Sequence, residues 1–176
     1  MERKISNIVL VGFMGTGKTS VGLQLAEMLE MQFVDTDDLI EADSDMTISD
    51  MFSKMGEEYF RNKESIAVER ASKLNNQVIA TGGGAVKRDE NVNNLKKTGI
   101  IFCLHASAEI ILQRTSSESH RPLLQVDDPI SRIRDMLKER EPFYAKADYT
   151  IDTSDLTIDQ ITKKIASIFS ENHTKT

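Results

Sequence analysis

The stretch that most constrains this chain is GFMGTGKT, which runs from Gly12 to Thr19. It matches the pattern G-x-x-x-x-G-K-[ST], directly after the apolar run IVLV and directly before a segment with helical spacing of its apolar residues. Glycines let the backbone fold around an anion, so that several N–H groups and the helix N-terminus point at it. Lys18 can reach the β- and γ-phosphates, and the Thr19 hydroxyl can bind Mg²⁺. We therefore predict a nucleoside triphosphate site, and not a glycine-rich turn with a chance Lys-Thr pair.

Short apolar runs alternate with segments of helical periodicity along the chain. The runs are residues 7–12, 32–35, 77–81, 99–105 and 149–152, and the segments between them include residues 19–30, 48–74, 108–115, 130–145 and 158–169. Several runs are almost continuously apolar, as expected of strands that are buried on both faces. The alternation predicts an α/β fold, with a parallel sheet that is covered by helices. Because no linker or repeat divides the chain, we expect one domain over residues 1–176.

Composition limits the partners that we expect. The formal net charge is -6 and the sequence pI about 5.1, so the overall field would repel nucleic acid and an anionic membrane surface. No apolar run approaches the roughly 20 residues of a membrane span. The only cysteine, Cys103, cannot form an internal disulfide. We expect a cytoplasmic protein that binds neither membrane nor nucleic acid.

One polar, serine-rich stretch, residues 114–129, interrupts this alternation and contains Pro122 and Pro129. Long irregular stretches in compact domains tend to be functional. A mobile lid over the phosphate site is our preferred interpretation, and an inert surface loop is the alternative. Arg121 in this stretch could neutralise charge on a phosphoryl group during its transfer, or it could be a solvated loop cation.

Two classes of phosphate-binding protein fit the sequence poorly. A GTPase switch needs an NKxD motif to read guanine, but the sequence NKES at residues 62–65 places Ser65 where the aspartate should be. Motors and large ATPases need an acidic strand end, whereas VIATGGG carries no acid. The class that remains is a small-molecule kinase that closes over two substrates. Closure in such an enzyme excludes the water that would otherwise compete with the acceptor hydroxyl.

The sequence FVDTDD places three carboxylates at the end of the second strand. In an extended chain, Asp35 and Asp37 would lie on the same side. One could then serve a metal ion while the other meets an acceptor hydroxyl. Alternatively, Asp37 or Asp38 could cap a following helix.

Glycines and arginines provide further candidates. Three consecutive glycines, Gly82–Gly84, end the third strand and would let a ligand lie against bare backbone. Arg61 has Glu64 three residues later on an expected helix, close enough to hold its guanidinium. Arg140 precedes Pro142, where we expect that helix to kink or end. Either arginine alone could be a surface charge, but two that converge would bind a carboxylate in a planar, bidentate way.

Taken in order, the motifs GFMGTGKT, VDTDD, YFR..E, ATGGGAV, RPLL and REPFY resemble the shikimate kinase family. The resemblance extends from about residue 8 to residue 152. It implies a P-loop kinase fold similar to that of nucleoside monophosphate kinases, with a five-stranded parallel sheet, helices on both faces and a mobile lid. It also implies ATP-dependent phosphorylation of the 3-hydroxyl of shikimate, in aromatic amino-acid biosynthesis.

The resemblance implies roles for individual residues. Catalytic roles are implied for Asp37, Lys18 and Arg121. Asp37 would contact the acceptor hydroxyl and could act as its base. Mg²⁺ would be bound by Thr19 and, through water, by Asp35. ATP contacts are implied at Gly12, Met14, Gly15, Thr16, Gly17, Lys18, Thr19, Ser20, Arg114 and Arg121. Shikimate contacts are implied at Asp37, Arg61, Gly82, Gly83, Gly84 and Arg140.

The sequence departs from the family at DTSDLTID, residues 152–159, where many relatives carry an arginine and a proline beside the adenine. This departure concerns the adenine contacts and not the phosphoryl chemistry. Two alternatives to a shikimate kinase are a gluconate kinase of the same fold and a nucleotide-binding module without catalysis. We expect a monomer whose partners are ATP and shikimate.

Overall fold

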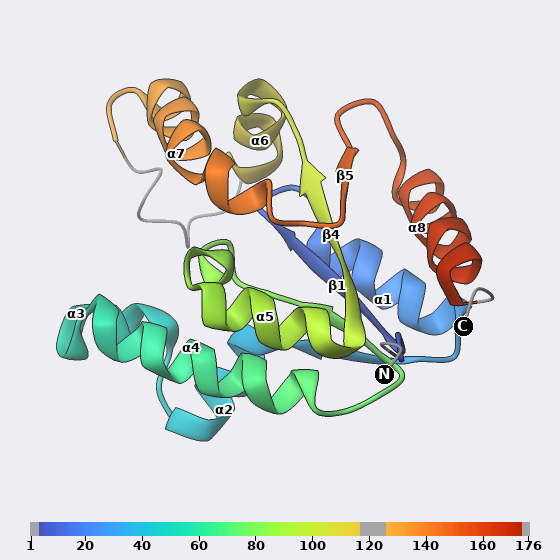
Figure 1. Ribbon diagram of the computed structural model, residues 1–176. Helices are drawn as coiled ribbons and strands as arrows, with labels where there is room; N and C mark the ends of the chain where they lie inside the picture. Colours follow the sequence, from blue (N-terminus) through green and yellow to red (C-terminus); the bar gives the residue numbers. More distant parts are fainter. Residues whose placement is uncertain (1–3, 117–125, 174–176) are drawn as a thin grey trace.

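A parallel sheet of five strands forms the centre of the computed structural model, which describes residues 4–116 and 126–173 (Figure 1). The strands are β1 (Asn7–Gly12), β2 (Gln32–Asp35), β3 (Gln77–Ala80), β4 (Gly99–His105) and β5 (Tyr149–Asp152). They lie in the order β2-β3-β1-β4-β5, and every pairing is parallel. The predicted sheet is confirmed. The third strand ends one residue earlier than predicted, although the amide of Thr81 still donates to the carbonyl of Leu10 at 3.1 Å.

Helices cover both faces of this sheet (Figure 1). They are α1 (Lys18–Met28), α2 (Thr36–Ser44), α3 (Ile48–Met55), α4 (Glu57–Ser72), α5 (Asp89–Thr98), α6 (Ala108–Thr115), α7 (Pro129–Tyr144) and α8 (Ile158–His173), with a 3₁₀ turn, η1, over Ala85–Lys87. Among the described residues, no helix is both long and apolar enough to cross a bilayer.

Strand β1 carries the core on both of its faces. Ile8 and Leu10 join the cluster beneath α1 and α8, whereas Val9 and Val11 join the cluster beneath α4 and α5. All six residues of β1 are buried, which explains why residues 8–11 form a continuous apolar run and do not alternate with polar residues. The site at the end of β1 is therefore held by a strand that is packed from two sides.

Two helical expectations needed correction. Residues 48–74 were expected to form one helical segment, but the chain breaks at Gly56, whose φ of +86° is strained for other residues. Helix α7 also continues for two residues beyond Pro142, which lies in its last turn. The break at Gly56 separates the short helix α3 from the longer helix α4, and both helices line one wall of the cavity described below.

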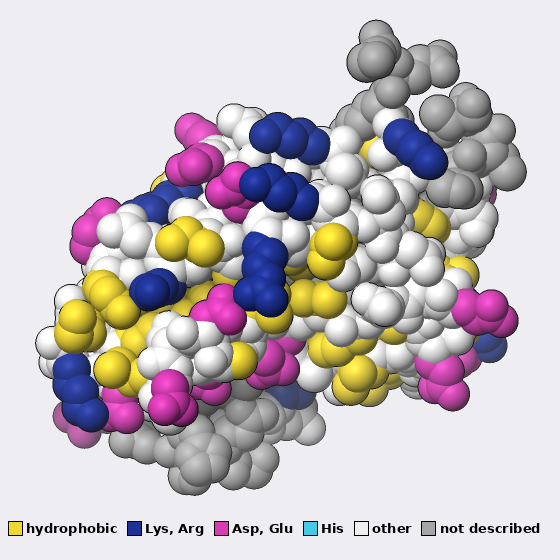
Figure 2. Space-filling view, turned by 90° about the horizontal axis from the view of Figure 1, so that it is seen from below, with side chains coloured by type: hydrophobic (Ala, Val, Ile, Leu, Met, Phe, Trp, Pro, Cys, Tyr) yellow, Lys and Arg dark blue, Asp and Glu magenta, His cyan; other side chains and the backbone are white. Residues whose placement is uncertain are grey.

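The surface charge is mixed on the face that Figure 2 shows, where Lys and Arg side chains lie between Asp and Glu side chains. Ion pairs such as Lys73–Glu69 and Arg70–Asp43 are exposed examples from α4 and its neighbours. Pairs of this kind contribute little to stability because solvent screens them.

Candidate active site

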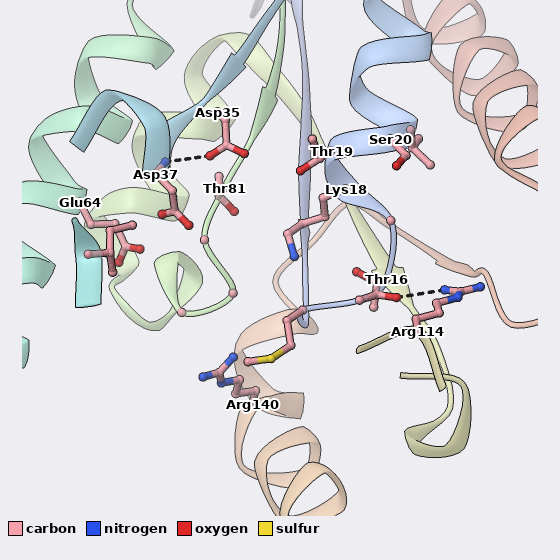
Figure 3. A pocket seen from close by; sticks show the side chains of 18 of the residues that line it. Thr16, Lys18, Thr19, Ser20, Asp35, Asp37, Glu64, Thr81, Arg114 and Arg140 are labelled. Atoms are coloured by element: carbon pink, nitrogen blue, oxygen red, sulfur yellow. Dashed lines mark hydrogen bonds between the residues drawn. The ribbon is translucent and has the colours of Figure 1, made fainter. Parts of the chain in front are cut away.

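A cavity of about 660 Å³ lies at the carboxyl ends of β1, β2 and β3 (Figure 3). This edge is where open α/β sheets bind their ligands. Most of the residues that the sequence nominated line this one cavity: Met14, Gly15, Thr16, Gly17, Lys18, Thr19, Ser20, Asp35, Asp37, Arg61, Gly82, Gly83, Gly84, Arg114 and Arg140. Gly12 lies just behind it, at the end of β1. Arg121 and most of the expected lid lie outside the described residues.

The loop between β1 and α1 has a backbone that requires glycine. Gly12, Gly15 and Gly17 have φ values of +142°, +74° and +98°. A Cβ on Gly12 would lie 2.3 Å from the carbonyl oxygen of Leu104, and a Cβ on Gly15 would lie 2.8 Å from Thr115. Gly17 caps α1 without a side-chain hydrogen bond, so the first N–H groups of the helix are left for a ligand.

Lys18 adds a positive charge to this loop. Its ammonium group donates to the carbonyls of Gly12 at 2.7 Å and Phe13 at 3.0 Å, across the mouth of the loop. The Thr16 hydroxyl donates to the same Phe13 carbonyl at 2.7 Å and braces the turn from inside. Together with the N-terminus of α1, these groups form an anion-binding site for a chain of phosphates.

The two aspartates after β2 are arranged differently from the expectation of one extended chain. Asp35 ends β2, but Asp37 already lies in the first turn of α2. The Asp35 carboxylate accepts from the amide of Asp37 at 2.8 Å, so Asp35 is the N-cap of α2, and not Asp37 or Asp38. Both carboxylates still line the cavity, where Lys18 and Thr19 face them from α1 (Figure 3).

Burial makes the Asp37 carboxyl group unusually basic. Its pKa is raised to about 7, first by burial and then by the charges of Asp35 and Glu64, while Lys18 opposes the rise. Burial also raises the pKa of Asp35. The Asp37 Oδ1 atom is buried and has no hydrogen-bond partner within the described part of the chain. A carboxylate in this state can accept a proton from a bound hydroxyl near neutral pH.

Glu64 is a cavity residue that the sequence placed only as a partner of Arg61. That partnership is confirmed, since Arg61 donates to Glu64 Oε1 at 2.7 Å. The second carboxylate oxygen, Oε2, is buried and also lacks a hydrogen-bond partner among the described residues. Both it and Asp37 Oδ1 approach Gly82, and Asp35 at the end of β2 lines the same cavity.

Arg61 and Arg140 reach the glycine stretch from different helices. A Cβ on Gly83 would lie 2.9 Å from Arg140 Nη1, and a Cβ on Gly84 would lie 2.5 Å from Arg61 Nη2. Neither position has room for a side chain beside its guanidinium group. The convergence that the sequence could only suggest is present, and it places two cations beside three bare backbone units.

An apolar wall completes this side of the cavity. Ile48 and Phe52 of α3 and Phe60 of α4 line it, and the rings of Phe52 and Phe60 have centroids 4.7 Å apart. Sequence reasoning missed these residues because their helical spacing fits core packing equally well.

The opposite end of the cavity is organised by Arg114 of α6. Its guanidinium donates to the carbonyl of Gly15 at 3.2 Å, to the hydroxyl of Thr153 at 3.1 Å and to the carbonyl of Thr153 at 3.0 Å. Leu156 and Ile158, both in the divergent stretch, line the same cavity. Arg114 thus ties the phosphate loop to the segment that follows β5.

The donors in the cavity suit Mg²⁺ bound together with a nucleotide. Within the described residues, no cluster of three or more His, Cys, Asp or Glu side chains could hold a metal ion without other ligands. Mg²⁺ is usually held by one or two protein oxygens together with phosphates and water. The Thr19 hydroxyl and the Asp35 carboxylate supply oxygens of this kind beside the phosphate loop.

Comparisons with known proteins identify relatives of this chain. The model of the family described as "SKI: Shikimate kinase" matches residues 14–169. A shikimate kinase of Thermoanaerobacter pseudethanolicus is 50% identical over 94% of this chain and 96% of its own length. A shikimate kinase of Caldanaerobacter subterraneus is 52% identical over 92% of this chain and 94% of its own. The solved structure of shikimate kinase from Acinetobacter baumannii in complex with shikimate has a TM-score of 0.89 at 41% identity, and covers 97% of this chain and 96% of its own.

Proposed function

The chain belongs to the shikimate kinase family, and we propose that its 660 Å³ cavity holds MgATP and shikimate side by side. As a member of that family, it is an ATP-dependent kinase that phosphorylates shikimate at its 3-hydroxyl, in the pathway to the aromatic amino acids. The observation that carries the proposed site is the meeting of Asp37, Lys18, Arg61 and Arg140 around one cavity.

The acceptor is held by the side of the cavity that α2, α4 and α7 form. Arg61 and Arg140 bind its carboxylate, and the backbone of Gly82–Gly84 lies against its ring. This arrangement explains how a chain with a net charge of -6 binds an anionic substrate, since a few directed cations outweigh the overall field at short range. The Oδ1 atom of Asp37 is buried and has no hydrogen-bond partner in the described parts of the chain, so it is left for a hydroxyl group.

Asp37 orients that hydroxyl and accepts its proton as the oxygen attacks the γ-phosphorus and ADP leaves. A carboxyl group whose pKa is raised to about 7 is a better base than an ordinary aspartate, although it remains partly ionised at neutral pH. Lys18 and the N-terminus of α1 stabilise the charge that develops on the phosphate oxygens. Positioning and electrostatics therefore account for most of the acceleration.

The Thr19 hydroxyl and, through water, the Asp35 carboxylate would hold Mg²⁺ beside the nucleotide phosphates. When bound, it neutralises phosphate charge. The role of Arg121 as a lid cation stays a prediction, as do the extent of the lid over residues 114–129, a single domain over residues 1–176, a monomeric state and a cytoplasmic location.

The test is ADP release from MgATP by the purified protein, with shikimate, with gluconate or with no acceptor. We expect release that depends on shikimate. Release with gluconate instead would contradict the assignment of Arg61 and Arg140 as a carboxylate clamp for shikimate. ATP binding without acceptor-dependent release would point to a nucleotide-binding module.

A further inference from the structure

Tyr144 lies four residues after Arg140 on α7, so both side chains project from the same face of the helix. Both reach the same glycine. The Tyr144 hydroxyl donates to the carbonyl of Gly83 at 2.9 Å, and a Cβ on Gly83 would lie 2.9 Å from Arg140 Nη1 and 3.7 Å from the Tyr144 hydroxyl. One helical turn of α7 thus provides two contacts to one residue of the glycine stretch.

The tyrosine remains a hydrogen-bond donor throughout the working pH range. Burial raises the pKa of its phenol to about 12, and the nearby Arg140 guanidinium opposes that rise. The ring packs against two core clusters, one between the sheet and α5 and one around Phe13 and α6. The hydroxyl is therefore presented to Gly83 from a rigid position.

The hydrogen bond has a consequence for the backbone that faces the acceptor. A peptide group is planar, and in the trans form its C=O and N–H point in opposite directions. A Gly83 carbonyl that is held toward α7 turns the N–H of Gly84 away from α7. The amide of Ala85 donates to the carbonyl of Gly82 at 3.1 Å and closes a turn around this peptide. Because both central residues of that turn are glycines, the peptide plane keeps much of its freedom to rotate, and the Tyr144 hydroxyl restricts it from outside the loop.

Helix α7 also contacts the phosphate loop. The Arg140 guanidinium carbon lies 5.1 Å from the centroid of the Phe13 ring, a geometry typical of a cation–π contact. Phe13 is only 1% exposed and follows Gly12 directly. The turn from Arg140 to Tyr144 therefore contacts both the loop of the phosphoryl donor and the loop of the acceptor.

We propose that Tyr144 is a positioning residue of the acceptor site: its hydroxyl fixes the Gly83–Gly84 peptide plane relative to Arg140, and so presents the glycine backbone and the arginine to one acceptor molecule. This inference rests on the proposed function, because it assumes that an acceptor lies against Gly82–Gly84. Tyr144 itself does not line the cavity and is not assigned a chemical step.

The variant Tyr144→Phe keeps the packed ring and removes only the hydroxyl. We expect kcat/KM for shikimate to fall about three- to ten-fold, as for the loss of one neutral hydrogen bond, while KM for ATP changes less than about two-fold. The matched control is Tyr149→Phe on β5, whose hydroxyl accepts from Asn172 at 3.2 Å at the surface and whose ring stacks on Phe102. It should retain wild-type kinetics.

A second measurement does not depend on activity. The chain contains nine glycines, so selective ¹⁵N-glycine labelling gives a simple amide spectrum. In the ligand-free protein, Tyr144→Phe should shift and broaden the Gly83 and Gly84 amide signals and leave those of Gly22 and Gly99 unchanged. The proposal would be overturned if the Gly83 and Gly84 signals did not move and kcat/KM for shikimate did not change. It would also be overturned if the variant lost apparent affinity for shikimate and for ATP to the same extent. If the wild-type protein does not phosphorylate shikimate, the proposed function is wrong. The amide spectra still test the Tyr144 contact in that case, because they are recorded without a substrate.

Discussion

Asp37 and Glu64 direct buried carboxylate oxygens, each without a hydrogen-bond partner among the described residues, at the same α-carbon, that of Gly82. A Cβ on Gly82 would lie 2.9 Å from Asp37 Oδ1 and 3.1 Å from Glu64 Oε2. The φ angle of Gly82 lies outside the left-handed region, so alanine can adopt its backbone conformation. Because Gly82 has no side chain, the space beside the carboxylates of Asp37 and Glu64 stays open.

The variant Gly82→Ala tests this relationship. The added methyl group meets flexible carboxylate ends and not backbone, so the fold should tolerate it while Asp37 and Glu64 move aside. We expect kcat with shikimate to fall about ten-fold or more, since misplacement of a catalytic group by ~1 Å can cost up to ~100-fold. The melting temperature should change by only a few degrees. Unchanged turnover would show that the position of Asp37 does not limit the reaction.

The role of Asp37 as a base predicts a pH dependence. Activity requires the ionised carboxylate, so kcat/KM for shikimate should rise with pH through the region near 7, to which burial, Asp35 and Glu64 raise its pKa. The variant Asp37→Asn should lower turnover about 100-fold or more and remove this rise. ATP binding, measured by calorimetry, should remain. If wild type and Asp37→Asn showed the same pH profile, the rise in activity near pH 7 would belong to another group.

The same buried carboxylate should destabilise the folded chain at high pH. The pKa of Asp37 is about 7 in the folded state against 3.8 in the unfolded state, so the folded protein binds the proton more tightly. The free energy of unfolding should therefore fall as pH rises from about 4 to about 7.

The variant Asp37→Asn has no carboxylate to ionise at this buried position. Without ligands, its free energy of unfolding should exceed that of wild type by about 1–3 kcal/mol at about pH 8. The difference should shrink as the pH approaches 4. Urea denaturation at both pH values measures it. Asp43→Asn, an exposed change on the same helix, is the control and should show no such trend.

Because Arg61 and Arg140 both line the acceptor side of the cavity with guanidinium groups, we predict that positive charge alone will not maintain acceptor binding. Arg140→Lys keeps the cation but loses the planar, bidentate fork. We expect KM for shikimate to rise about ten-fold, with KM for ATP within about two-fold of wild type. Arg70→Lys changes an exposed arginine that pairs with Asp43, and steady-state kinetics should not distinguish it from wild type. Equal KM values for Arg140→Lys and wild type would contradict a bidentate clamp.

The strands could be predicted almost to the residue because β1, β3 and β4 are buried on both faces and thus continuously apolar. Two helices were not predicted. Helix α2 buries only Thr36 and Ile40, and α5 buries only two apolar residues, Val92 and Leu95, so neither sequence shows a wide apolar face. The break at Gly56 was missed because apolar periodicity continues from α3 into α4.

The site was predictable where chemistry is encoded locally. The phosphate loop takes its shape from neighbouring glycines, so its pattern is visible in eight consecutive residues. The contacts of Glu64 with the Gly82 region and of Tyr144 with Gly83 join residues far apart in the chain, 61 positions in the second case. No local pattern marks such residues, because their role arises only when the helices meet.

The segment after β5 begins with a threonine that contacts an arginine of α6. Thr153 is fully buried, and its hydroxyl donates to the carbonyl of His105 at 3.0 Å while accepting from Arg114 at 3.1 Å. A threonine hydroxyl can do both at once. Thr153 therefore holds Arg114 in place beside the phosphate loop, on the side of the cavity that we propose for the nucleotide.

Thr153→Val preserves the shape of this side chain and removes both hydrogen bonds. We expect KM for ATP to rise about three- to thirty-fold, because Arg114 loses a partner and the carbonyl of His105 loses a donor. KM for shikimate should stay within about two-fold, since Arg114 lies on the nucleotide side. Thr150→Val changes an exposed threonine on β5 that does not line this cavity and serves as the control, with wild-type KM values for both substrates. If Thr153→Val raised KM for shikimate as much as KM for ATP, the division of the cavity into two sides would be wrong. A selective loss of ATP affinity would instead identify Thr153 as the residue that organises nucleotide binding after β5.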